Sequence, residues 1–252
     1  MPSDGTGRSS AVRRAAQVLS ELATSPESLT IADLARRIDA PKSTLADIAA
    51  TLVNTGMATR RLDGGLRLGP HVAQLAQGLA AGTPLLELFS EAVRRLGPLE
   101  QTMVVATLID LDTAYLAVEP GNLPLPLTLK VGLRLPAWST GTGRALLTSY
   151  TLDEVAAMHR TAAPESPRGR PFRLEELLHA LDVARRLGYA SNTEIGEMQL
   201  AGTAALVHGP NGPVAAIGCI SPLHDASQRQ HRDVALVRTL ASQLAGALRS
   251  PS

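Results

Sequence analysis

Three hydroxyl residues and two glycines stand together at residues 139–143, where the sequence reads Ser139, Thr140, Gly141, Thr142 and Gly143 ahead of a helical pattern. The first N–H groups of a helix have no partner within the helix, and glycines allow another group to approach the backbone closely. The segment therefore has the groups needed to hold a carboxylate or another small anion. It fits equally well a capped helix start with a tight turn, and it lacks the Gly-x-x-x-x-Gly-Lys-Ser/Thr spacing of a phosphate-binding P-loop.

Catalytic and metal chemistry have little support elsewhere in the chain. The six histidines show no His-x-x-x-His spacing, and neither a Gly-x-Ser-x-Gly elbow nor a paired-carboxylate motif occurs. Cys219 could meet His208 or His224, but a buried, inert thiol in an apolar strand is the simpler interpretation. We therefore expect no enzyme activity, no metal site and no cofactor.

A second group of polar residues lies between residues 42 and 51. Lys42, Ser43, Thr44, Asp47 and Thr51 point outward on a helix whose other side is apolar, so they are candidates to contact base edges in a DNA major groove. Asp47 is the unusual member, because a carboxylate can accept from cytosine N4 but is repelled by phosphate. Pairing of Asp47 with Lys42 or Arg61, without any contact to a base, remains an equal alternative.

Three arginines follow at residues 60, 61 and 67. Guanidinium groups pair with phosphate bidentately, and such contacts fix a protein's position on a duplex without reading its sequence. Arg60, Arg61 and Arg67 are therefore expected to bind the DNA backbone. A solvated arginine surface is the alternative interpretation.

The local elements that would position these groups form a helix-turn-helix. Thr30 and Asp33 have the spacing of a capping box, and they begin a short helix with an apolar face. Pro41 suits the start of the next helix, because its missing N–H needs no partner there. Gly56 is placed to end that helix in a left-handed conformation.

A two-stranded wing and a linker follow. The segment Asp63-Gly64-Gly65 between two short β-rich runs predicts a hairpin that carries the three arginines. Apolar residues at helical spacing over residues 71–81 predict a linker helix. We expect this linker and the first helix to form a homodimer, or a dimer of dimers, because so small a DNA reader usually needs two half-sites. Packing of the linker on its own domain is the alternative.

The chain resembles IclR-type transcriptional regulators over nearly its whole length. The resemblance rests on five segments in the right order: 10–19 (SAVRRAAQVL), 41–44 (PKST), 66–70 (LRLGP), 135–147 (LPAWSTGTGRALL) and 185–190 (RRLGYA). It implies an N-terminal winged helix-turn-helix that binds a palindromic double-stranded DNA operator. It further implies a C-terminal domain with a GAF-like antiparallel sheet and flanking helices, in which a small-molecule effector binds around residues 139–143.

Two departures from the family pattern bear on the effector. Ala201 stands where a cysteine is usual, and near Cys219 only Ser221 remains of two usual serines, with a register that can slip by one residue. With Val105 and Trp138 as apolar walls, these residues suggest a larger or more apolar organic acid, or an aromatic acid or amide. The alternative functions are a sensor or protein-interaction module that does not bind DNA and, with less support, an enzyme.

The order of β-rich and helical runs in the rest of the chain predicts an α+β fold. Strands are expected at 102–109, 113–118, 125–131, 200–207 and 214–220, and helices at 152–159, 174–187 and 228–248, with an exposed loop at 162–171. The expected domains are a disordered head at 1–8, a DNA-binding domain at 9–69, a linker helix at 70–83 and an effector domain at 84–250.

Composition is consistent with a cytoplasmic two-domain protein. At 252 residues and 44% hydrophobic content, the chain can bury two cores. The net charge is only +1, but residues 1–68 hold nine Lys and Arg against seven Asp and Glu, so the positive charge is local. A single cysteine argues against a disulfide or a zinc cluster, and no apolar run is long enough for a membrane span or a signal peptide.

Overall fold

The computed structural model describes residues 6–81, 84–161, 172–195 and 199–249. The chain divides into two compact units, Met1–Gly82 and Thr83–Ser252, and each has its own core. Within the described residues, no helix is long and apolar enough to cross a membrane.

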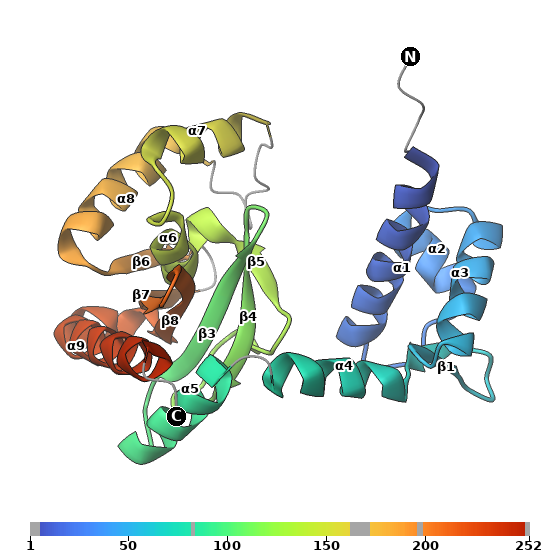
Figure 1. The fold of residues 1–252 in the computed structure, drawn as a ribbon, viewed down its shortest axis with the longest axis horizontal. Coiled ribbons are helices and arrows are strands. Elements are labelled where there is room, and N and C mark those ends of the chain that lie inside the picture. Colours follow the sequence, from blue (N-terminus) through green and yellow to red (C-terminus); the bar gives the residue numbers. More distant parts are fainter. Residues whose placement is uncertain (1–5, 82–83, 162–171, 196–198, 250–252) are drawn as a thin grey trace. The chain divides into compact units, whose positions relative to one another are not determined.

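The first unit consists of four helices and a hairpin (Figure 1). Its elements are α1 (Thr6–Thr24), α2 (Ile31–Ile38), α3 (Lys42–Asn54), β1 (Ala58–Arg60), β2 (Leu66–Leu68) and α4 (Pro70–Ala81). The predicted capping box at α2 is confirmed, because the Thr30 hydroxyl accepts from the Asp33 N–H while the Asp33 carboxylate accepts from the Thr30 N–H. Gly56 follows the end of α3 with φ +71°, as the sequence predicted.

One apolar cluster holds α1, α2, α3 and the hairpin together. Val18 of α1, Leu34 of α2 and Leu45 of α3 are fully buried, as is Leu66 of β2. Leu29, in the connection before α2, forms an isolated antiparallel bridge to Leu66, so the hairpin gains a third strand segment at its inner edge. Burial of one face of α3 in this cluster leaves its opposite face to solvent.

The second unit is an antiparallel sheet with helices on both faces. Its elements are α5 (Pro84–Leu96), β3 (Thr102–Ile109), β4 (Asp112–Glu119), β5 (Arg134–Pro136), the 3₁₀ turn η1 (Ala137–Ser139), α6 (Gly141–Leu147), α7 (Leu152–Thr161), α8 (Leu174–Leu187), β6 (Ala190–Ile195), β7 (Leu200–Gly209), β8 (Gly212–Pro222) and α9 (Leu223–Arg249). The strand order is β5-β4-β3-β8-β7-β6, and all neighbouring strands pair antiparallel.

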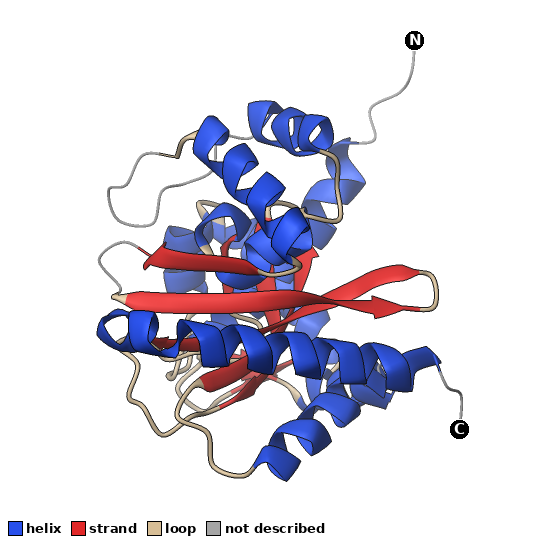
Figure 2. Cartoon of the chain, turned by 90° about the vertical axis from the view of Figure 1, so that its left-hand side faces the viewer, coloured by secondary structure: helices blue, strands red, loops and turns tan. Residues whose placement is uncertain are grey.

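Alternation along the central strands gives the sheet two different faces. On one face, Met103, Val105 and Ile217 pack with α5 and α9, and Figure 2 shows α9 lying along the sheet. On the other face, Val104, Ala106 and Ala216 pack with α6 and α8. The predicted antiparallel α+β fold with flanking helices is therefore confirmed.

Three expectations from the sequence need correction. The segment 125–131 is not a strand, because Pro124 and Pro126 have no N–H to donate to a ladder at its start. Strand β6 was not predicted, since its polar sequence ASNTEI shows no apolar alternation. The head is not irregular through residue 8, because α1 begins at Thr6, where unpartnered first-turn N–H groups are tolerated. Residues 1–5 and the predicted loop at 162–171 lie outside the described residues.

Candidate functional site

Helix α3 presents a polar stripe to solvent. Lys42, Ser43, Asp47 and Thr51 are exposed and Thr44 is half-buried, while Leu45, Ile48, Ala49 and Leu52 form the buried side. Four-residue spacing places Ser43, Asp47 and Thr51 one above the other. The Thr51 hydroxyl donates to the Asp47 carbonyl 3.0 Å away. It can therefore only accept a hydrogen bond from a further partner.

Small residues, which sequence reasoning missed, complete this face. Ala46 and Ala50 are exposed between the polar positions, and Asn54 is exposed at the end of the helix. An alanine lets a helix approach base edges closely, and its methyl group can contact a thymine methyl. The sequence did hold a signal for this face, because these two alanines do not fall at the helical spacing of the buried residues.

Asp47 has no ion pair within the part of the chain that the structure describes, and neither Lys42 nor Arg61 pairs with it. By contrast, Arg36 and Arg37 are engaged by Asp33 and Glu21. The proposed intramolecular partner of Asp47 is therefore not found.

The wing places its three arginines differently. Thr59 pairs with Arg67 and Arg60 pairs with Leu66, so Arg60 and Arg67 lie on opposite faces of the hairpin. Arg60 donates to the Gly64 carbonyl at 3.2 Å, and Arg67 donates to the Pro26 carbonyl at 3.1 Å. Arg61 lies just beyond β1 and is exposed.

The hairpin tip is fixed by Asp63. Its carboxylate accepts from the Gly65 N–H at 2.9 Å and from the Ser28 hydroxyl at 3.1 Å. These hydrogen bonds, the one from Gly65 first, hold the pKa of Asp63 below its usual value. The tip is therefore tied to the connection between α1 and α2.

In the second unit, the start of α6 packs directly on the sheet. Thr140 caps the helix by accepting from the Gly143 N–H at 2.9 Å. A Cβ added to Gly141 would lie 2.5 Å from the Gly202 carbonyl oxygen, and one added to Gly218 would lie 2.7 Å from Thr142 Cγ2. These glycines thus allow α6 to pack closely on strands β7 and β8, and little open space is left beside them.

A cavity of about 10 Å³ remains at this contact, which is room for about one water. Of the residues predicted for an effector, Thr140, Gly141, Thr142 and Cys219 line it. Tyr115, Gly202, Thr203 and Ile220 line it as well and were missed. A lone tyrosine within an apolar strand was the available signal for Tyr115.

Hydroxyl groups are concentrated around this cavity. The Thr140 hydroxyl lies 3.1 Å from that of Thr113 and 3.4 Å from that of Thr142, and Tyr115 and Thr142 line the same cavity. Burial raises the pKa of Tyr115 to about 12, so the phenol is neutral and can donate a hydrogen bond.

Other predicted effector residues lie elsewhere. Strand register puts Val105, Ala201 and Ser221 on the face toward α9, together with the Cys219 thiol. Their neighbours Gly202, Gly218 and Ile220 face α6 instead. A one-residue shift of register moves every side chain of a strand to the other face, and the family pattern fixes this register only to within one residue.

The remaining three predicted residues, Trp138, Ser139 and Gly143, do not line this cavity. Trp138 packs edge-on against Phe172 with ring centroids 5.4 Å apart. The Ser139 hydroxyl donates to the Pro136 carbonyl at 2.8 Å, and the Ser139 carbonyl accepts from Asn192. Gly143 lies against Ala137, where a Cβ would meet the carbonyl oxygen at 2.2 Å.

A loop rich in leucine covers the α6 face of the sheet. In residues 121–133, which we call the leucine loop, Leu125, Leu127 and Leu129 are half-buried against the cluster that contains Tyr115 and Ile220, and the alternate residues are exposed. Within the described chain, no backbone N–H from residue 124 to 131 donates to a strand. Residues 124–131 therefore pack on the sheet through side chains, whereas the end of the loop is held by backbone hydrogen bonds that join Gly132 and Leu133 to Tyr115.

Cys219 is part of a buried polar cluster beneath α9. The Asp233 carboxylate accepts from Gln101, and the Cys219 thiol lies near enough to Asp233 for each group to affect the pKa of the other. Burial raises the pKa of the thiol well above its usual value, which agrees with an inert cysteine.

Family models match both units of the chain. Residues 11–62 match the IclR helix-turn-helix domain, and residues 84–245 match the bacterial transcriptional regulator IclR C-terminal domain. The HTH-type transcriptional regulator TtgV of Pseudomonas putida is 26% identical over 188 residues, which are 73% of this chain and 70% of TtgV.

Solved structures show the same fold. The repressor BlcR of Agobacterium tumefaciens is 25% identical with a TM-score of 0.59, covering 96% of this chain and 97% of that one. An IclR homologue from Microbacterium hydrocarbonoxydans, crystallised with 4-hydroxybenzoate, is 23% identical with a TM-score of 0.74, covering 94% and 98%.

Proposed function

The chain belongs to the IclR family of bacterial transcriptional regulators, and on that premise we propose that it binds an operator through α3 and the wing, under control of an organic acid bound beside α6. It is a DNA-binding regulator with a C-terminal effector-binding domain. The observation that best supports binding through α3 is the exposed stripe of Ser43, Asp47 and Thr51, beside which Ala46 and Ala50 are also exposed. We propose that this stripe lies in the major groove.

The wing then supplies phosphate contacts. Arg61 is exposed and forms no salt bridge within the described residues, so it is the strongest candidate. Arg60 and Lys42 are also exposed, and we propose that they add contacts to the DNA backbone.

The operator half of the proposal is tested by binding to the DNA that flanks the protein's own gene. Replacing Ser43 and Thr44 by alanine should weaken specific binding by roughly 1–3 kcal/mol for each base that the side chains no longer reach. Binding to unrelated duplex should change little. A footprint that is unaltered in both variants would contradict the proposal, and failure of the native chain to bind any fragment would favour a protein-interaction module.

The effector half rests on the chemistry of the cavity walls. Tyr115 and Thr142 offer buried hydroxyls, and Leu125, Leu127 and Leu129, which pack against the same cluster as Tyr115, would add apolar area to an opened cavity. This pairing of apolar area with a few polar groups suits an aromatic acid. The homologue bound to 4-hydroxybenzoate supports this ligand class.

An effector of that size needs the cavity to open, because about 10 Å³ holds no organic molecule. We propose that the leucine loop moves, since no N–H from 124 to 131 ties it to a strand. The ligand regulates only if it binds the DNA-competent and DNA-incompetent states with different affinity. A coupling of about 1–3 kcal/mol would change operator affinity roughly five- to 150-fold.

The effector half is tested with 4-hydroxybenzoate as the first probe. Calorimetry should show binding that Tyr115→Phe and Thr142→Val each weaken by about 0.5–1.5 kcal/mol. Hydrogen exchange of residues 124–131 should change when the probe binds. Binding that neither substitution affects would place the effector elsewhere. Gly141→Val is a poor test, because its side chain would push against the Gly202 backbone.

We also propose that the protein acts without catalysis, as a cytoplasmic homo-oligomer on a palindromic operator. The family match supports regulation as its task.

A further inference from the structure

A second and larger cavity lies between α8 and α9, beside the part of β7 that extends past β6. Its volume is about 520 Å³, within the range of small-molecule sites. Ala190 of β6 pairs with Ala204, so the stretch of β7 from Ala205 onward has β8 as its only partner strand within the described chain. We call this cavity the α8–α9 groove.

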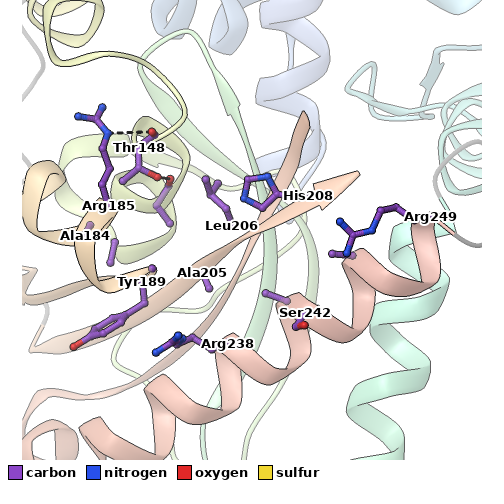
Figure 3. Close-up of a pocket in the computed structure, with 15 residues that line it drawn as sticks. Thr148, Ala184, Arg185, Tyr189, Ala205, Leu206, His208, Arg238, Ser242 and Arg249 are labelled. Atoms are coloured by element: carbon purple, nitrogen blue, oxygen red, sulfur yellow. Dashed lines mark hydrogen bonds between the residues drawn. The ribbon is translucent and has the colours of Figure 1, made fainter. Parts of the chain in front are cut away.

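The groove has cationic groups toward both ends. Figure 3 shows Arg238 reaching toward Tyr189 at one end, and His208 and Arg249 lying toward the other. Arg185 also lines the groove, but its guanidinium is engaged by the Thr148 and Tyr150 carbonyls. Among the described residues, no aspartate or glutamate lines it.

The two arginines of α9 are placed to act together. Residues 238 and 249 are eleven positions apart, which is close to three whole turns, so both lie on the same side of the helix with Cα atoms roughly 16 Å apart. Both are exposed, and neither forms a salt bridge within the described residues.

Between its two cationic ends, the groove is lined mainly by small apolar side chains. Six alanines supply them: Ala145, Ala184, Ala190, Ala205, Ala241 and Ala245. Larger side chains at these positions would fill the groove. Ser242 adds a hydroxyl on α9.

We propose that the α8–α9 groove binds an elongated organic dianion, with one anionic group near Arg238 and the other near Arg249 and His208. The alanine walls contact its apolar middle, and the guanidinium groups pair with carboxylate or phosphate oxygens. This site shares no lining residue with the cavity beside α6, so it is a second ligand site that does not depend on the effector site proposed above.

The positive charge of the groove distinguishes among three possible occupants: a second copy of the chain, an acidic peptide and a small dianion. A second copy of the same groove would bring arginine against arginine, which disfavours symmetric pairing here. An acidic extended peptide has the right charge, but a small molecule fits the bounded volume better, and the experiment separates these two.

The probe is octanedioate, with octanoate as its monoanionic counterpart, titrated into the full-length protein by calorimetry. Octanedioate should bind, and octanoate should bind on the order of tenfold more weakly because it has one carboxylate fewer to pair with a guanidinium group. Arg238→Gln and Arg249→Gln should each weaken octanedioate binding by a similar factor. His208→Gln should also weaken octanedioate binding, because the imidazole lines the same end of the groove as Arg249.

Matched controls keep the result clear. Arg232→Gln changes an exposed arginine of the same helix that does not line the groove, and it should leave binding unaltered. Thr142→Val in the α6 cavity should also leave octanedioate binding unaltered, so failure of the effector proposal is visible separately. Thermal unfolding of each variant shows that it is folded.

The proposal is overturned by octanedioate binding that survives both Arg238→Gln and Arg249→Gln, or by no binding at millimolar concentration. It is also overturned when only a short peptide of alternating glutamate and valine binds, in an Arg238-dependent way, because the groove would then be a peptide-docking edge.

Discussion

Arg67 on β2 donates through Nη2 to the carbonyl oxygen of Pro26, 3.1 Å away in the connection between α1 and α2. The pairing of Leu29 with Leu66 and the hydrogen bond from Ser28 to Asp63 join the same two segments. The Arg67 side chain therefore has a structural task in addition to any contact with DNA, whereas the Arg61 side chain forms no hydrogen bond or salt bridge in the described chain.

This difference gives the first prediction. Arg61→Gln should lower affinity for all duplex sequences alike and flatten the dependence of log K on log salt by about one unit, because one phosphate is no longer neutralised. Arg67→Gln should in addition lower the unfolding free energy. Fluorescence anisotropy across a salt series, with denaturant unfolding alongside, measures both. Equal salt slopes for Arg61→Gln, Arg60→Gln and the native chain would indicate a solvated arginine surface.

A second prediction concerns the contact between Gly141 and Gly202. Gly141→Ala should destabilise the C-terminal unit by about 1–3 kcal/mol, because its Cβ would lie 2.5 Å from a backbone oxygen that cannot rotate away. The matched control is Gly246→Ala on the exposed side of α9, where a Cβ meets nothing within 4 Å. That change should stabilise by about 0.5–1 kcal/mol. Urea unfolding of both variants measures the difference, and equal midpoints would count against tight packing here.

A third prediction concerns pH. Burial raises the pKa of Asp233, so the folded state holds this proton at a pH where the unfolded chain has released it. Stability from this group is therefore present below the usual aspartate pKa of 3.8 and is lost as pH rises through the higher folded value. Subtracting the pH profile of Asp233→Asn from that of the native chain isolates this component from other carboxylates. If the difference in unfolding free energy between the two proteins does not change from about pH 3.5 to about pH 7, burial does not raise the pKa of Asp233.

A fourth prediction concerns self-association. Val12 of α1 is 72% exposed and Leu75 of α4 is 52% exposed, which is unusual for large apolar side chains on helices. We expect these helices to pack against a second copy, so Leu75→Glu should shift sedimentation from dimer toward monomer and weaken operator binding. Leu62→Glu, at an exposed position of the wing, is the control. A native chain that sediments as a monomer at micromolar concentration would exclude this interface.

Local signals predicted the first unit well, because its elements depend on short-range chemistry. The Thr30–Asp33 capping box, the left-handed Gly56 and the Asp63-Gly64-Gly65 turn each involve residues within four positions of one another. The same is true of the antiparallel turn between β3 and β4, where Ile109 pairs with Asp112.

The residues that line the cavity beside α6 were predicted less well, because their side-chain directions depend on register between distant strands. Which of Ala201 and Gly202 faces α6 is decided by pairing with β8, whose paired residues Ser221 and Ile220 lie far along the chain, and not by the local sequence. The α8–α9 groove was not predicted at all, since Tyr189, His208 and Arg238 share no sequence spacing and meet only in the fold.

The leucine loop has a consequence for how such a protein can acquire new specificity. Its leucines pack against the cluster that contains Tyr115 and Ile220, which line the cavity, yet the N–H groups from 124 to 131 donate no hydrogen bond to a strand of the described chain. Exchanging these side chains therefore alters what the cavity accepts without shifting the register of the sheet. A library confined to residues 124–131 should therefore yield altered responses, provided that its members keep apolar side chains at the half-buried positions, because the strand register is set by residues elsewhere in the sequence.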